Sequence, residues 1–417
     1  MSQASVASES ITILEMAKIL KDVFDLKIDQ SNLIVEGLKA GWLDASATEI
    51  GQVILAKDIF PDTNAGQMRE ALKTGHFPDW EQKIALTILY NDGAAANRQL
   101  AEWIKQNGMW SRGIDSEGNW FFYDNNSPKL PECPFIVIDV QVEHLNDQLL
   151  AEFARLAEPC IGLNWAYLSG ISKEDLTGAA FRNLLKIKSL GRLSFVKTSA
   201  KQADFALLGD LPLLREISIG DSYGDTTAKE FLNAISKMPR LINVGINNCP
   251  TRDEDLMNLL QLPALESVYV NSFLLTNTVF DHLAGITTLQ ELALHSNQFT
   301  DAIWQKLTSC SKLKRLQISA ANLIVGTGIR ALAQLPDLIR VNLAALSLQD
   351  ASLAEIAELS QIRELIIEAN PITDAGIAHL YQMSNLKQLG LRQTQVTSVG
   401  ISALKSALPN CKVESDV

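Results

Sequence analysis

A histidine and a serine are the residues whose types and spacing come closest to a catalytic pair. His295 and Ser319 are 24 residues apart, and the same interval recurs through much of the chain, so equivalent positions of successive repeats can lie side by side. A hydroxyl next to an imidazole could act as a nucleophile with its base. The preceding equivalent position holds Asn271 rather than a carboxylate, and no glycine-rich turn supplies an oxyanion hole. We therefore expect no catalytic residue and no enzyme activity.

The sequence also lacks motifs for a metal or a cofactor. Its five cysteines are irregularly spaced and no two form a C-x-x-C pair, so neither a zinc site nor a disulfide framework is indicated. The other histidines lack metal-ligand spacing, and there is no P-loop or G-x-G-x-x-G turn. The acidic residues of Asp221–Asp225 and of Asp115–Gly118 are better explained as turn chemistry. We expect no metal and no cofactor.

Composition narrows the class of partner. The 417 residues are 47% hydrophobic and 20% charged, which is typical of a globular protein. The formal net charge of −12 argues against nucleic acid, which calls for a basic footprint. No apolar run reaches the ~20 residues that cross a bilayer, and the first residues lack the basic and apolar regions of a signal peptide. We predict a cytoplasmic protein that binds neither nucleic acid nor membrane.

A repeated phrase predicts the elements that position these residues. The phrase apolar-x-x-apolar-x-apolar starts at eleven places, mostly 24 residues apart: Phe135, Cys160, Leu190, Leu214, Leu241, Leu265, Leu289, Leu313, Leu338, Ile362 and Leu386. A unit of this length cannot bury its own apolar face, so the units must stack. Alternation in the centre predicts a short strand, and the segment after it predicts a return helix. Thr373, Thr300 and Gln349, each followed by Asp, are the expected N-caps of several such helices.

The phrase resembles that of the leucine-rich repeat family, L-x-x-L-x-L-x-x-N/C-x-L, over residues 135–411. Residues 289–299 fit every fixed position, with Asn297 at the ninth, and residues 407–413 look like the closing segment of bacterial members. The resemblance implies an α/β horseshoe solenoid with a concave parallel sheet and convex helices. Positions 1, 4, 6 and 11 should be buried. The ninth position, where the chain turns, holds Thr198, Ser222, Cys249, Phe273, Asn297, Ala321, Leu346, Asn370 and Thr394.

The first third of the chain has a different pattern. Residues 11–108 have helical periodicity and repeat loosely, and Gly41, Gly75 and Gly108 follow predicted helices as left-handed caps. We predict an all-α domain of helical hairpins at residues 1–108. Residues 109–134 are expected to form a β-hairpin and linker that caps the apolar end of the solenoid, which then occupies residues 135–417.

The register of the phrase fixes which strand residues face outward. Along one column, Glu291, Arg315, Arg340 and Glu364 form either a self-satisfied charge ladder or a charged platform with Tyr269 as an aromatic anchor. The predicted partner-binding residues of the concave face are Arg192, Glu216, Asn243, Asn247, Tyr269, Asn271, Glu291, His295, Arg315, Gln317, Arg340, Asn342, Glu364, Glu368 and Arg392.

These observations predict a non-enzymatic protein that binds a protein or peptide on its concave face, with an adaptor as a specific form of this function. Two alternatives remain open. One is a regulator of a nucleotide hydrolase, although the repeats of the family that does this are longer. The other is a structural scaffold that forms a homo-oligomer through the N-terminal helices.

Overall fold

The computed structural model divides the chain into two compact units. The first contains the described residues up to Phe195 together with Leu207–Leu214, and the second contains Val196–Ala206 and Arg215–Val417. The residues that the structure describes are 95–115, 120–127, 129–132, 135–160, 163–170, 178–198, 200–222 and 227–417. The helical hairpins predicted before residue 95 lie outside this part of the chain, and the proposed domain limits remain a prediction.

The first unit begins with a helix over residues 95–106. Leu100 and Ile104 on this helix are buried, and the amide oxygen of the buried Asn97 accepts a hydrogen bond from the Val137 backbone at 2.7 Å. Gly108 then adopts a left-handed conformation with φ 76°, which confirms the predicted glycine cap. The equivalent predictions for Gly41 and Gly75 fall outside the described residues.

The strands of the first unit neighbour one another in the order β2-β1-β3-β4-β5. Strand β1 is antiparallel to both β2 and β3, whereas β3 and β4 are parallel. The predicted hairpin is therefore present as β1 and β2, and its turn at 116–119 lies outside the described residues. The bounds are β1 (Trp110–Asp115), β2 (Trp120–Tyr123), β3 (Phe135–Leu145), α6 (Asp147–Ala157), β4 (Trp165–Gly170), α7 (Gly178–Leu184) and β5 (Arg192–Val196).

The register predicted for the first two repeats is wrong. Strand β3 pairs with β4 through Val140 opposite Ala166 and Val142 opposite Leu168, and all four side chains are buried. The repeat phrase therefore starts at Val137 and Leu163, not at Phe135 and Cys160. Residues 135–138 are all apolar, so periodicity alone could not fix the register there.

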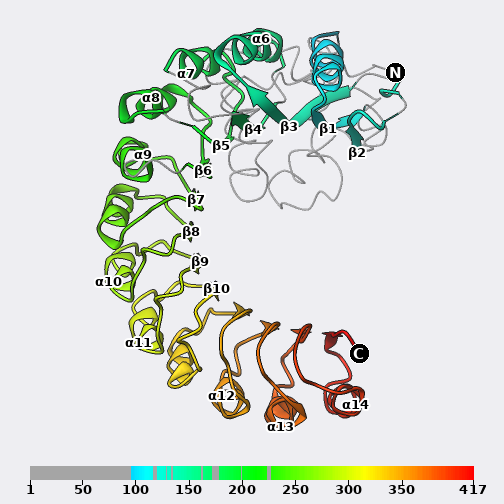
Figure 1. Ribbon diagram of the computed structural model, residues 1–417, viewed down its shortest axis with the longest axis vertical. Helices are drawn as coiled ribbons and strands as arrows, with labels where there is room; N and C mark the ends of the chain where they lie inside the picture. Colours follow the sequence, from blue (N-terminus) through cyan, green and yellow to red (C-terminus); the bar gives the residue numbers. More distant parts are fainter. Residues whose placement is uncertain are drawn as a thin grey trace, which may run out of the picture. The chain divides into compact units, whose positions relative to one another are not determined.

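The second unit is a stack of parallel strands with helices on one side (Figure 1). Its strands β6 to β14 neighbour one another in chain order and line the concave side of this unit, while α9 to α14 follow its convex side (Figure 1). The strands are β6 (Glu216–Gly220), β7 (Asn243–Asn247), β8 (Ser267–Asn271), β9 (Glu291–His295), β10 (Arg315–Ser319), β11 (Arg340–Asn342), β12 (Glu364–Ile366), β13 (Gln388–Gly390) and β14 (Lys412–Glu414). The predicted parallel solenoid is confirmed here.

The return segments of the second unit are short helices, several of them of the 3₁₀ type. Many contain five residues or fewer, which suits a repeat that has about 24 residues for a strand, two turns and a helix. Their bounds are α8 (Gln202–Leu207), α9 (Thr227–Ile235), η2 (Asp253–Gln261), α10 (Val279–Leu283), α11 (Ile303–Leu307), η3 (Ile329–Gln334), α12 (Asp350–Ile356), α13 (Asp374–Ile377), η4 (Ala378–Gln382) and α14 (Ser398–Ala407).

The buried columns of the second unit follow the predicted fourth and sixth positions. Leu292 lies opposite Leu316, and Leu365 lies opposite Leu389, and each of these side chains is at most 1% exposed. At the end of the stack, β14 pairs in parallel with β13, and Cys411 just before it is buried. The residues between these columns alternate to the solvent side, as the strand pattern predicts.

Most repeats of the second unit turn at a residue in the left-handed conformation. These residues have φ between 47° and 58° and come directly before the ninth position of the phrase. The ninth side chain then points inward, as for the buried Ser222, Ala321 and Asn370. The left-handed residues are Lys197, Asp221, Asn248, Ala320, Ala345, Ala369 and Gln393.

The ninth position is wrongly predicted in the two repeats that begin with β8 and β9. Phe273 is 59% exposed and Asn297 is also exposed, whereas Ser272 and Ser296 are buried in their place. No residue of these two turns has a positive φ, so the chain turns one residue earlier. The buried hydroxyls replace the expected asparagine, since Ser272 donates to the Thr251 carbonyl at 2.9 Å and Ser296 to the Leu275 carbonyl at 2.7 Å.

The eleventh position also departs from the expectation in one repeat. Leu323 is 59% exposed, and the following residue, Ile324, is fully buried instead. This repeat runs from Leu313 to Leu338 and so contains one residue more than the 24-residue repeats around it. The additional residue moves Leu323 out of the core.

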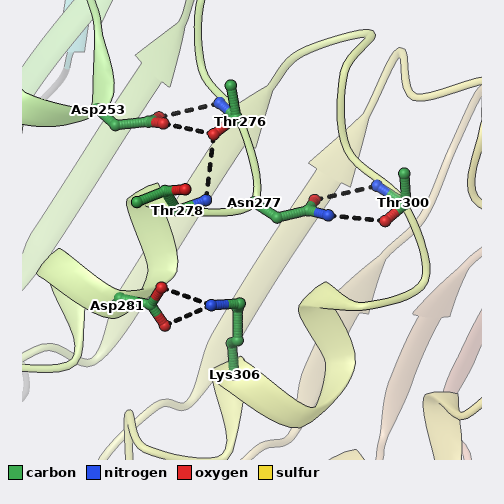
Figure 2. Close-up of polar contacts among 7 residues, drawn as sticks. All are labelled: Asp253, Thr276, Asn277, Thr278, Asp281, Thr300 and Lys306. Carbon is green, nitrogen blue, oxygen red and sulfur yellow. Dashed lines mark hydrogen bonds and ion pairs between the residues drawn. The ribbon is translucent and has the colours of Figure 1, made fainter.

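Side-chain hydrogen bonds join four pairs of consecutive repeats near the start of their return helices. The Asp253 carboxylate accepts from both the backbone and the hydroxyl of Thr276, and the Thr276 hydroxyl accepts from the Thr278 amide (Figure 2). Asn277 forms the equivalent pair of bonds with Thr300 in the next repeat (Figure 2). Asp350 with Thr373 and Asp374 with Thr397 repeat the arrangement. We call these four pairs, three Asp–Thr and one Asn–Thr, the clamps, because each fixes one repeat against the next.

Thr373 and Gln349 occupy N-cap positions as predicted, and Thr300 does not. Thr373 caps α13 by accepting from the Ala375 amide at 3.2 Å. Gln349 precedes α12 without a capping side-chain hydrogen bond, and the cap residue of α11 is Ala302 rather than Thr300. Thr300 instead accepts at its hydroxyl from the Asn277 side-chain amide of the preceding repeat, whereas the Thr373 hydroxyl donates to Asp350 and so can still accept from the Ala375 amide.

Gly400 tests the importance of the clamps. A methyl group at this position would overlap the Asp374 carboxylate that binds Thr397. We expect Gly400→Ala to lower the free energy of unfolding by about 1–3 kcal/mol, the usual cost of overpacking, as measured by urea denaturation. The same substitution in an Asp374→Ala background should cost clearly less. Equal costs in the two backgrounds would show that the carboxylate is not the obstacle.

Candidate functional site

A shallow hollow lies on the outward face of β8, β9, β10 and β11. Its volume is about 360 Å³. Ser267 and Ala293 have small side chains and form the floor of the hollow. The larger side chains of Tyr269, Arg315 and Gln317 surround them on the same face. The complete lining is Ser267, Val268, Tyr269, Glu291, Leu292, Ala293, Arg315, Leu316, Gln317, Arg340 and Asn342.

The structure brings only part of the predicted site together. Six predicted residues line the hollow, namely Tyr269, Glu291, Arg315, Gln317, Arg340 and Asn342. Others lie on outward strand positions away from it, namely Glu216, Asn243, Asn247, Asn271, His295 and Glu364. Glu368 and Arg392 come just after β12 and β13. Arg192 belongs to the first unit, where its Nη2 is 3.9 Å from Asp139 Oδ1.

Sequence reasoning missed the two residues that create the hollow. The register of the phrase places Ser267 and Ala293 on the outward face, but their small side chains carry no binding chemistry, so the predicted site does not include them. A usable signal was present, because a small residue between larger ones in the same row of a sheet leaves a depression. Ala293 lies opposite both Tyr269 and Gln317.

Charged residues cross the hollow as the predicted ladder. In the parallel register Arg315 lies opposite both Glu291 and Arg340, and Arg340 lies opposite Glu364. Arg315 forms an ion pair with Glu291, and Arg340 Nη1 is 3.3 Å from Glu364 Oε2. All four side chains are 40–54% exposed, so each pair contributes only about 0–1 kcal/mol to stability.

A polar cluster adjoins the hollow toward the carboxyl ends of the strands. The Tyr269 hydroxyl donates to Asn247 Oδ1 at 3.3 Å, and the Asn271 amide donates to the same oxygen at 3.2 Å. The rings of Tyr269 and His295 are tilted with centroids 5.4 Å apart. Burial raises the pKa of Tyr269, so this phenol stays neutral and can both donate and accept.

The predicted contact between His295 and Ser319 is present. Ser319 Oγ lies 2.6 Å from His295 Nδ1, and Gln317 Nε2 lies 3.3 Å from His295 Nε2. An amide therefore takes the place that a carboxylate holds in a catalytic triad. Ser319 is only 8% exposed, so its hydroxyl is poorly placed to attack a substrate. The contacts fix the imidazole ring beside Tyr269.

The environment of His295 predicts a pH dependence. Burial lowers the pKa of His295 below its ordinary value of about 6.5, so folding favours the neutral ring. The contribution of the neutral His295 ring to the free energy of unfolding should be complete above about pH 6.5. It should decrease as the pH falls from there toward the lowered pKa of the folded state. We expect the loss of melting temperature between about pH 7.5 and about pH 5 to be smaller in His295→Gln than in the wild type. An equal loss would show that His295 does not titrate in this way.

The part of the chain that the structure describes contains neither a cluster of metal ligands nor a membrane-spanning helix. Among those residues, no three His, Cys, Asp or Glu side chains gather as metal ligands would. No described helix has both the length and the apolar character needed to span a bilayer.

Comparison with known proteins gives likenesses of fold only. No family model and no curated protein sequence matches the chain. Among solved structures, an internalin (inlF) of Listeria monocytogenes is 15% identical, with a TM-score of 0.42 over 80% of this chain and 97% of that one. Internalin C2 of the same species is 17% identical, with a TM-score of 0.32 over 64% and 92% of the two chains. A leucine-rich repeat protein of Leptospira interrogans is 14% identical, with a TM-score of 0.29 over 66% and 89%.

The fold can be assigned from the chain itself. The repeat phrase recurs at intervals of 24 to 27 residues between Leu214 and Leu386, and the strands it specifies pair in parallel with equivalent residues opposite one another. The second unit has the fold of a leucine-rich repeat solenoid.

Proposed function

We propose that this protein binds another protein or a peptide, without enzyme activity, through the concave face of the second unit. The hollow on β8 to β11 is the observation that carries this proposal. It combines an aromatic side chain, two arginines and two carboxamides on one surface, and arginine and tyrosine are enriched at the residues that dominate binding energy.

A rigid support favours the same interpretation. The hollow is formed by strand residues rather than by loops, and the Asp253–Thr276 and Asn277–Thr300 clamps join the repeats that contain β7, β8 and β9. A surface held in this way loses little conformational freedom when a partner binds, which lowers the cost of binding.

An adaptor that brings a partner to another protein is the specific form that we propose. The polar character of the face supports reversible rather than permanent association. A reducing, cytoplasmic location agrees with the described cysteines, since Cys160, Cys249, Cys310 and Cys411 are buried and free of disulfides.

Filling the hollow should test the proposed function. Peptides that bind the intact protein can be selected from a phage-displayed library of random dodecapeptides, and their affinities measured by fluorescence anisotropy. We expect Ala293→Trp to weaken the selected peptides at least about tenfold, because the indole occupies the floor of the hollow.

The matched control is Ala354→Trp, which places the same side chain at an exposed position of α12 on the convex side. It should leave the affinities unchanged, and both variants should melt near the wild-type temperature. If no peptide is selected, or if all selected peptides bind Ala293→Trp normally, the hollow is not the binding site.

A further inference from the structure

We infer that the hollow receives the carboxylate of an aspartate or glutamate side chain, carried by an extended peptide segment of a protein partner that also bears an apolar residue a few positions away. The inference rests on the proposed function and adds the chemistry of the partner to it. Charge, exposed apolar side chains and strand geometry each support one part of this description.

The first argument is the sign of the local charge. The chain as a whole carries a formal charge of −12. The charged side chains that line the hollow, however, are those of two arginines and one glutamate. The lining therefore has a formal charge of +1 on a negatively charged protein, and Glu364, which pairs with Arg340, lies outside it. A positively charged lining attracts an anionic group and orients the approach of its partner.

The second argument is the arrangement of Arg315 and Arg340. They lie directly opposite each other on β10 and β11, and like charges at opposed positions of a sheet are unfavourable. Their ion-pair partners stand on the two outer sides, Glu291 on β9 and Glu364 on β12. A carboxylate that enters between β10 and β11 would meet two guanidinium groups and would relieve their mutual repulsion.

Both arginines remain able to bind a second carboxylate. Their side chains are 54% and 47% exposed, and a guanidinium group has five N–H donors. Each ion pair with glutamate uses only part of this capacity. An aspartate or glutamate of the partner can thus form charge-assisted, forked hydrogen bonds without the loss of the ladder that is already present.

The third argument is an exposed apolar edge at the carboxyl ends of the same strands. Phe273 follows β8, and Leu323 and Val325 follow β10, and all three are more than 40% exposed. The edge is held by contacts between the loops, since the Gln298 side chain donates to the Phe273 carbonyl and Thr300 forms a bridge with Leu323. We call Phe273, Leu323 and Val325 the apolar edge.

The distance between the hollow and the apolar edge sets the spacing in the peptide. Arg315 and Ser319 are the first and last residues of β10, which at ~3.3 Å per residue places them ~13 Å apart, and the turn toward Leu323 adds to this distance. An extended peptide covers the interval with roughly four to six residues. The partner segment therefore carries an acidic residue and, at about that separation, an apolar one.

The composition of the selected peptides tests this inference on the intact chain. Dodecapeptides that bind the wild type, but not Ala293→Trp, should be enriched in Asp or Glu with an apolar residue roughly four to six positions away. Selection on the Arg315→Gln/Arg340→Gln variant should lose the acidic preference. The Arg315→Lys/Arg340→Lys variant keeps both charges and should retain it. Thermal unfolding of each variant shows whether the fold is preserved.

A change in the peptide alone gives an answer that does not depend on the folding of any variant. Replacement of the acidic residue of a selected peptide by its amide should weaken binding to the wild-type protein about tenfold. Peptides that require the hollow but show no acidic preference, or that tolerate the amide, would overturn this inference and leave the proposed function standing. The absence of any peptide that requires the hollow would overturn both.

Discussion

Asn370→Ala is expected to destabilise the protein by about 3–5 kcal/mol, a large effect for one polar side chain. Asn370 is 2% exposed, and the carbonyl oxygens of Leu343, Ile367 and Glu368 lie 2.9–3.0 Å from its amide nitrogen. Its two N–H groups donate to these three oxygens, so one N–H group is shared. Its amide oxygen accepts from the Leu348 backbone at 3.1 Å. Alanine would leave several buried backbone groups without these partners, and each such group costs about 1–3 kcal/mol. Urea denaturation followed by circular dichroism measures the loss.

Asn297→Ala is the matched control for this prediction. Asn297 occupies the same ninth position of its repeat phrase, but its side chain is exposed because the chain turns one residue earlier. We expect this variant to lose less than about 0.5 kcal/mol, as surface substitutions do. Similar losses for the two asparagines would contradict the inward and outward placements described above.

Leu292→Ala should cost about 2–5 kcal/mol, because it opens a cavity in a packed column. Leu292 is 1% exposed and lies between Val268 and Leu316 of the neighbouring repeats. The same strand carries the floor of the hollow at Ala293, so we expect selected peptides to bind this variant more weakly under conditions where it begins to unfold. Chemical denaturation gives the free energy, and anisotropy gives the affinity.

Glu291→Ala provides the comparison for Leu292→Ala on the adjacent residue. The Glu291 side chain is 41% exposed, and its ion pair with Arg315 contributes little to stability. Its removal should cost no more than about 1 kcal/mol. A loss as large as that of Leu292→Ala would mean that the assignment of inward and outward positions on β9 is incorrect.

The sequence alone was sufficient for the alternation of the solenoid strands. Leucine, isoleucine and valine recur at the fourth and sixth positions of the phrase from Leu214 onward. Since a strand has only two faces, the column of buried residues also determines which residues face outward. The outward placement of Tyr269, Arg315 and Arg340 follows from that register alone. The meeting of His295 and Ser319 followed in the same way.

The backbone conformation of the turns could not be predicted, because the local residue types are compatible with a left-handed turn and also with a turn one residue earlier. Alanine at 320, 345 and 369 adopts a left-handed conformation, which costs a non-glycine residue roughly 1–2 kcal/mol and is tolerated only because the strand on one side and the buried ninth residue on the other are already fixed. In the β8 and β9 repeats a buried serine satisfies the backbone without that strain. The periodicity is compatible with either turn.

What the amino-acid sequence determined by itself is the repeat, the face of each solenoid strand and the set of charged residues along it, since these depend on periodicity within one segment. The stacking of the repeats, in contrast, determines where that face is hollow, which asparagine is buried and which carboxylate binds the next repeat. Each of these depends on side chains about 24 residues apart that meet only after the repeats stack, as Ala293 does with Tyr269 and Gln317. The volume left between them is a property of the stack and not of any one repeat.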